Sequence, residues 1–217
     1  MNNGTKNEKI ELEPNSKPYL FKRIISDGFD TVVIFLLFMV LSAALFISPL
    51  AKTYNDHYDR YMEIQNAAVE EFGDDAIAIR DSLNGNDEYR DERFAANLHG
   101  YLLKLLAGLL AEAPVLLIVP LVSKTRGTPG KLFTKIMPFC MKKSARASRL
   151  QVFGRFIFVF IIDSAGLYLL TGIYTFLLVP VLRLIVMLLN KKNRTILDFL
   201  SGITIIETLS YNGIDNI

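Results

Sequence analysis

Long apolar stretches alternate with polar, strongly charged stretches along this chain. Residues 31–51 carry no charged side chain over twenty-one positions, and residues 164–182 carry none over nineteen. About 18 apolar residues are enough to cross a bilayer as a helix. The pattern therefore predicts membrane-spanning helices at about 29–50 and 101–123, and further spans near the second uncharged stretch.

The apolar segment 152–189 is too long for one span. A single straight helix of this length would be almost twice as long as the hydrocarbon core, which is about 30 Å thick. Thr171-Gly172 is its weakest helical point, so we predict two spans, at about 153–170 and 173–189. The predicted fold class is an all-α membrane protein with four transmembrane helices.

Polar segments flank these spans. Residues 1–18 predict a flexible tail, and 206–217 a short C-terminal tail, around a membrane domain at 19–205. Residues 51–99 hold twelve acidic and five basic residues. Tyrosines recur there at helical spacing, which predicts that span 1 continues as an amphipathic helix. Gly73 is a candidate for the end of this helix. Together with a returning helix it would form an acidic helical hairpin between spans 1 and 2.

The distribution of charge predicts the orientation. Residues 124–151 hold eight Lys and Arg and no acidic residue. Because short cytoplasmic loops are enriched in Lys and Arg, this loop and both termini are expected in the cytoplasm and the acidic hairpin outside. We expect a multi-pass protein in the cytoplasmic (inner) membrane of a bacterium. Membrane orientation explains the basic loop, so no nucleic-acid partner is predicted.

The composition argues against several classes of site. A single Cys excludes an internal disulfide, an iron–sulfur cluster and a Cys-rich zinc site. His57 stands near Asp56, Asp59 and Glu63, but no established metal-ligand spacing is present. No catalytic constellation of Ser, Cys or His occurs either. The sequence therefore predicts no enzyme, no cofactor and no resident metal.

Three ionisable residues open span 1. Arg23, Asp27 and Asp30 stand at i, i+4 and i+7, which places them on one helical face. One interpretation is an ion pair that fixes the helix at the membrane interface. The other is a proton or cation site, because ionisable groups inside a helical bundle are functional candidates.

Glu112, Asp163 and Arg183 stand deeper in the predicted spans. A charge near the bilayer centre costs about 2.5–3.5 kcal/mol on insertion scales, so each needs a reason to be there. Mutual pairing inside the bundle is one reason. A relay of carboxylates that bind protons or cations is the other. The small residues Ala107, Gly108 and Ala111 predict a close-packing face for a homo-oligomer.

Several short motifs resemble the RDD family of bacterial membrane proteins. The family has an Arg seven residues before an Asp with a small residue between them, as in Arg23, Ser26 and Asp30. Its cytoplasmic turn resembles Gly127-Thr-Pro-Gly130-Lys131, and Arg155 resembles an Arg that opens the following span. The C-terminal signature resembles 194–204, with Arg194 and Asp198. The family often has Gly where Arg126 stands and His where Leu197 stands.

Two of these motifs have further interpretations from their residues. Thr195 and Asp198 have the spacing of a capping box, but Asp198 could equally pair with Arg194, Arg155 or Arg23. The turn departs from a phosphate-binding loop in both spacing and final residue. It is expected to turn the chain below span 2, with bases against anionic lipid headgroups. The turn and headgroup residues are Gly127, Gly130, Lys131 and Lys135.

Three functions follow as hypotheses. The first is a transporter that exchanges a monovalent cation for protons through Asp27, Asp30, Glu112 and Asp163; the resemblance points the same way, since some RDD members are described as sodium/proton-type antiporters. The second is a non-transporting accessory or assembly subunit that docks a membrane or envelope protein through the acidic hairpin. The third is lipid or stress sensing by the basic loop.

Overall fold

The computed structural model describes residues 17–140, 145–162, 185–189 and 195–207. They divide into two compact units, Met1–Leu36 with Ala111–Ile217, and Leu37–Leu110. The predicted span at 153–170 lies partly outside the described residues, and the span at 173–189 lies largely outside them. Asp163, Arg183 and Arg194 also lie outside the described residues.

Two helical stretches are long and apolar enough to cross a membrane, Leu20–Ile47 and Asp87–Val122. Only 22% of the most apolar window of the first and 33% of that of the second is buried within the chain. The core helix of a water-soluble protein is mostly buried instead. These exposed apolar surfaces suit contact with lipid, and they match the predicted spans 1 and 2.

Helix α1 (Lys17–Ile47) does not continue into the acidic segment, contrary to the prediction. It ends at Ser48, whose hydroxyl donates to the Leu45 carbonyl at 2.7 Å. Pro49 has no N–H for the helical hydrogen bond, and a 3-10 turn, Pro49–Ala51, follows. Helix α2 (Lys52–Phe72) then begins as a separate element.

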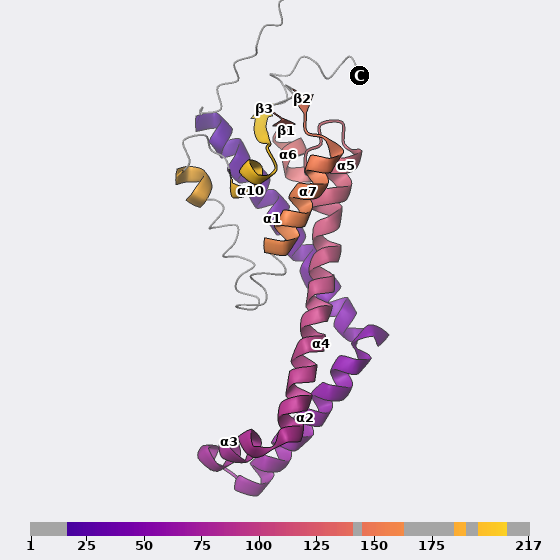
Figure 1. Cartoon of the computed structure of the whole chain (residues 1–217), viewed down its shortest axis with the longest axis vertical. Coiled ribbons are helices and arrows are strands. Elements are labelled where there is room, and N and C mark those ends of the chain that lie inside the picture. Colours follow the sequence, from indigo (N-terminus) through magenta and orange to yellow (C-terminus); the bar gives the residue numbers. More distant parts are fainter. Residues whose placement is uncertain (1–16, 141–144, 163–184, 190–194, 208–217) are drawn as a thin grey trace, which may run out of the picture. The chain divides into compact units, whose positions relative to one another are not determined.

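The second unit contains the acidic segment, folded as helices (Figure 1). Gly73, with a φ of 58°, ends α2, as its sequence position predicted. Asp75 caps α3 (Ala76–Gly85) through hydrogen bonds from the backbone N–H groups of residues 77 and 78. Asn86 accepts from the N–H of Tyr89 at 3.0 Å, at the start of α4 (Asp87–Glu112).

Helices α2 and α4 lie side by side. The Nδ1 atom of His57 lies 2.6 Å from Oε2 of Glu92, and Nε of Arg60 lies 2.9 Å from Oε1 of Glu88. The rings of His57 and His99 stack with centroids 5.4 Å apart. These contacts join the two ends of the segment that was predicted to form a hairpin.

Beyond α4, the first unit contains short elements. A π-helical segment, Ala113–Ile118, leads to α5 (Val119–Val122). The basic segment then forms α6 (Pro129–Phe133), strand β1 (Ile136–Cys140) and strand β2 (Ala145–Arg146). Helix α7 (Arg149–Val159) follows, and α10 (Ile196–Leu200) and strand β3 (Thr204–Glu207) lie near the C-terminus.

The strands correct the all-α prediction. They form an antiparallel sheet in the order β2-β1-β3, with Met137 opposite Ile206 and Phe139 opposite Arg146. Strand β3 also crosses residue 206, where the C-terminal tail was predicted to begin. The sheet joins the basic segment to the C-terminal segment (Figure 1).

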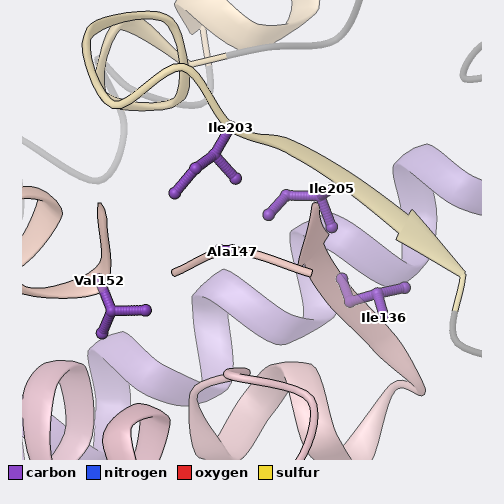
Figure 2. Close-up of a cluster of buried hydrophobic side chains, with 5 residues drawn as sticks. All are labelled: Ile136, Ala147, Val152, Ile203 and Ile205. Atoms are coloured by element: carbon purple, nitrogen blue, oxygen red, sulfur yellow. The ribbon is translucent and has the colours of Figure 1, made fainter. Parts of the chain in front are cut away.

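Both faces of β1 are buried, which makes the sheet the core of this unit. Figure 2 shows one cluster, where side chains from β1, α7 and the β3 region converge: Ile136, Ala147, Val152, Ile203 and Ile205. Met137, Phe139 and Ile206 form a second cluster. Helix α6 packs against β1, and α10 packs against α7 and β3. This core therefore holds the cytoplasmic-turn motif and the C-terminal motif in place.

Candidate functional site

A network of acidic and basic side chains forms on the predicted polar face of α1. Arg23, Ser26 and Asp30 are buried, and Asp27 is partly exposed beside them. Their helical spacing puts them on one side of α1, as the sequence predicted. Their partners come from α6, α7 and α10, which belong to the other sequence motifs.

Asp30 anchors the turn that opens α6. The Thr128 hydroxyl donates to Oδ2 of Asp30, and the backbone N–H of Gly130 donates to Oδ1 at 2.7 Å. The Lys131 ammonium lies 3.8 Å from Oδ2. Because Asp30 accepts an N–H in the first turn of α6, it replaces the capping side chain that Thr128 does not supply. The sequence analysis did not single out Thr128, the N-cap residue of α6, as a partner of Asp30. Its place before Pro129-Gly130 is typical of an N-cap and could have pointed to it.

The same turn approaches the α1 backbone closely. A Cβ atom added to Gly130 would overlap the carbonyl oxygen of Ser26. Only glycine allows this approach, which brings the backbone N–H within reach of Asp30. Gly130 and Ser26 therefore pack directly against each other.

Lys131 is buried and bonded to α1, so the prediction that it meets lipid headgroups is wrong. Its ammonium donates to Oδ1 of Asp27 at 3.0 Å and to Oγ1 of Thr128 at 3.3 Å. The Lys131 side chain is 4% exposed and the Asp27 side chain 41%. Lys135, by contrast, is exposed and ends α6 in the left-handed conformation, with a φ of 56°.

Asp198 takes both of the roles that the sequence left open. Its Oδ2 atom accepts from the Thr195 N–H at 3.1 Å, while its own N–H donates to the Thr195 hydroxyl at 3.2 Å, which is a capping-box arrangement. The same carboxylate pairs with the buried Arg23 and, at 3.1 Å, with Arg155. Burial disfavours the charged form, but Arg155 and Arg23 outweigh it and hold the pKa of Asp198 well below its ordinary value.

The network is balanced in charge. Each of its carboxylates faces at least one cationic group, so the buried charges compensate one another. Removing one partner of such a network leaves an uncompensated buried charge. Its members are Asp27, Asp30 and Asp198 with Arg23, Lys131 and Arg155.

Glu112 lies at the end of α4. It is 3% exposed, and the π-helical segment that begins at the next residue packs against α7. Pro114 lacks the N–H of a regular helical hydrogen bond, and it lies in these π-helical turns. Such turns are frequent at functional sites.

One other sequence interpretation fails on packing. Ala107, Gly108 and Ala111 are buried within the chain, so they present no free face to a second copy. In the part of the chain that the structure describes, no three His, Cys, Asp or Glu side chains gather as metal ligands would. His57 instead contacts Glu92 and His99.

Gly127 completes the turn motif. Its carbonyl accepts from the Ser123 hydroxyl at 3.3 Å, and a Cβ at this position would press on Lys131. The motif residues thus hold α6 against α1 and point Lys131 at Asp27.

Comparison of the chain with family models, curated proteins and solved structures found no match.

Proposed function

We propose that the chain is a multi-pass membrane protein of the RDD type that exchanges a monovalent cation for a proton. In this proposal it lies in the cytoplasmic membrane of a bacterium, with both termini and the charge network on the cytoplasmic side. The two long apolar helices and the concentration of Lys and Arg in residues 124–151 support this placement.

One observation carries the proposal: a buried ammonium is paired with an accessible carboxylate. Lys131 is almost fully buried, and its partner Asp27 is 41% exposed. A cation arriving from solvent can therefore reach the carboxylate that neutralises Lys131. The other acids of the network are less suited, because Asp30 and Asp198 are buried and bonded to protein donors.

The exchange conserves charge. A sodium or potassium ion binds the Asp27 carboxylate and displaces the Lys131 ammonium, which releases one proton to water and becomes a neutral amine. In the reverse step the amine takes up a proton and returns to Asp27 as the cation leaves. Asp30 and Thr128 keep the Lys131 side chain beside Asp27 in both states. Glu112 and Asp163 would provide further carboxylates along the spans.

The test measures cation-driven proton movement in proteoliposomes that contain the purified chain and a trapped pH dye. We expect a sodium or potassium gradient to change the internal pH, and Asp27→Asn or Lys131→Met to abolish this change. Asp56→Asn removes an exposed acid of α2 and serves as the matched control, with activity unchanged. Absence of the pH change with folded wild-type protein would refute the proposal, as would full activity of both variants.

A non-transporting accessory or assembly subunit is the second candidate. The balanced network of Arg23, Arg155 and Asp198 favours it, since such pairing serves to hold helices together. The acidic segment 51–99 would then dock a membrane or envelope protein. Crosslinking in native membranes distinguishes the two: this candidate predicts one specific partner that is lost when acids of α2 and α3 are neutralised, and no cation-driven proton movement.

A further inference from the structure

Three arginines of the first unit form no ion pair with an acidic residue of the described ranges. Arg126 follows α5, Arg146 belongs to β2 and Arg149 begins α7. The sequence has no Asp or Glu between Glu112 and Asp163. This cluster contrasts with the charge network on α1, where every base faces an acid.

Backbone contacts hold Arg126 and Arg146 near the end of α5, and α7, which begins at Arg149, packs against α5. The Arg126 guanidinium donates to the carbonyl of Leu121, at the end of span 2. Arg146 donates through Nη1 to the carbonyl of Lys124 at 3.0 Å. Burial lowers the pKa of Arg126, because it disfavours the charged form of the guanidinium. The positive charges of Arg149 and Arg146 lower this pKa further.

The backbone at Arg126 is strained in a way that glycine would relieve. Its φ is 59°, in the left-handed region that disfavours any residue with a Cβ. Helix termination explains the same conformation at Lys135, whose N–H donates to Leu132 after α6. A strained arginine within a cluster of like charges indicates that its side chain has a use.

We propose that Arg126, Arg146 and Arg149 bind the phosphate group of an anionic phospholipid. Val122 and Leu150 lie beside the cluster in sequence and are 76% and 79% exposed, and their helices α5 and α7 pack together. Val122 ends an apolar helix that is long enough to span the membrane. An acyl chain would cover these two side chains while the headgroup meets the guanidinium groups, which bind phosphate with paired donors.

The test is native mass spectrometry of the full chain in detergent, titrated with dioctanoyl phosphatidylglycerol. Dioctanoyl phosphatidylcholine and inorganic phosphate are the comparison probes. Each base near a membrane surface contributes about 1 kcal/mol. We therefore expect R126Q/R146Q/R149Q to weaken phosphatidylglycerol binding about a hundredfold and Arg149→Gln alone about fivefold. Lys52→Gln, which removes an exposed base at the start of α2, should leave binding unchanged.

Arg126→Gly separates binding from folding. It removes one charge and relieves the left-handed strain, so we expect weaker phosphatidylglycerol binding together with a higher melting temperature. If the triple variant fails to fold, this variant and Arg149→Gln decide the outcome. Equal phosphatidylglycerol affinity of wild type and variants would overturn the proposal. Inorganic phosphate or phosphatidylcholine binding as tightly as phosphatidylglycerol would also overturn it, since an anionic lipid would then not be the ligand.

Discussion

Gly130 packs directly on the backbone of Ser26, and a Cβ atom at residue 130 would overlap the Ser26 carbonyl oxygen. The contact joins the turn before α6 to the face of α1 that carries Asp30. It sets the distance over which the Gly130 N–H reaches the Asp30 carboxylate, 2.7 Å. The turn before α6 and the Arg23–Asp30 segment of α1 therefore contact each other through their backbones as well as through their charged side chains.

Gly130→Ala should destabilise the protein through this contact. The added methyl group must push α6 away from α1, and overpacking of this kind costs about 1–3 kcal/mol. We expect a lower Tm in detergent micelles. Gly154→Ala is the matched control, because a Cβ there meets nothing within 4 Å and alanine favours helix α7. An unchanged Tm in Gly130→Ala would show that the turn can move without cost.

Asp198→Asn should destabilise the protein more strongly. Arg23 is 1% exposed and would lose its negative partner, and breaking a buried ion pair costs about 3–5 kcal/mol. Thermal unfolding followed by circular dichroism measures the loss. Glu207→Gln removes the partner of Lys22 in a half-exposed pair and should cost about 1 kcal/mol or less. Equal losses in the two variants would contradict the importance of the buried pair.

The stability from Asp198 should also depend on pH. Its pKa is depressed in the folded protein because Arg155 and Arg23 outweigh the effect of burial. The unfolded chain, with an ordinary carboxyl pKa of about 3.9, then binds the proton more readily at acidic pH. The contribution of Asp198 is therefore complete above this pH and decreases as the pH falls below it. The difference in Tm between wild type and Asp198→Asn should narrow as the pH is lowered from neutral to about 3, and parallel profiles would contradict this.

The sequence predicted helices better than strands. Apolar periodicity and the glycine at position 73 marked the helices and one of their ends, but Pro49 interrupts a segment that was expected to continue. Strand β1 was missed because it is five residues long and contains Pro138, which is unusual in a central strand. Its partner β3 is distant in the sequence, and β2 has only two residues. The local sequence pattern cannot predict that β1 pairs with so distant a strand.

The candidate site was predicted as a set of residues, while the choice of pairs among them was left open. Helical spacing placed Arg23 and Asp30 on one face of α1, and the structure places them there. Their partners, Asp198 and the Thr128–Gly130 turn, come from distant segments that the sheet holds in position. Lys131 appeared to be a surface base because local sequence cannot report that α1 and α6 enclose it.

Thr128 provides a sharp test of how Asp30 and Lys131 are held. Its hydroxyl donates to Asp30 and accepts from the Lys131 ammonium at 3.3 Å, so one oxygen serves both charges. Thr128→Val keeps the shape of the side chain but leaves both partners short of a hydrogen bond, at a cost of about 1–3 kcal/mol. We expect a lower Tm, whereas Thr128→Ser keeps the hydroxyl and should remain close to wild type.

A double-mutant cycle with Asp30→Asn extends this test. If Thr128 acts through Asp30, the combined loss in T128V/D30N should be smaller than the sum of the two single losses, because the second change removes a bond that is already broken. Thermal unfolding of all four proteins in the same detergent gives the interaction energy. Fully additive losses would show that Thr128 stabilises the turn independently of Asp30, and the hydroxyl would then matter for α6 and not for the position of the carboxylate.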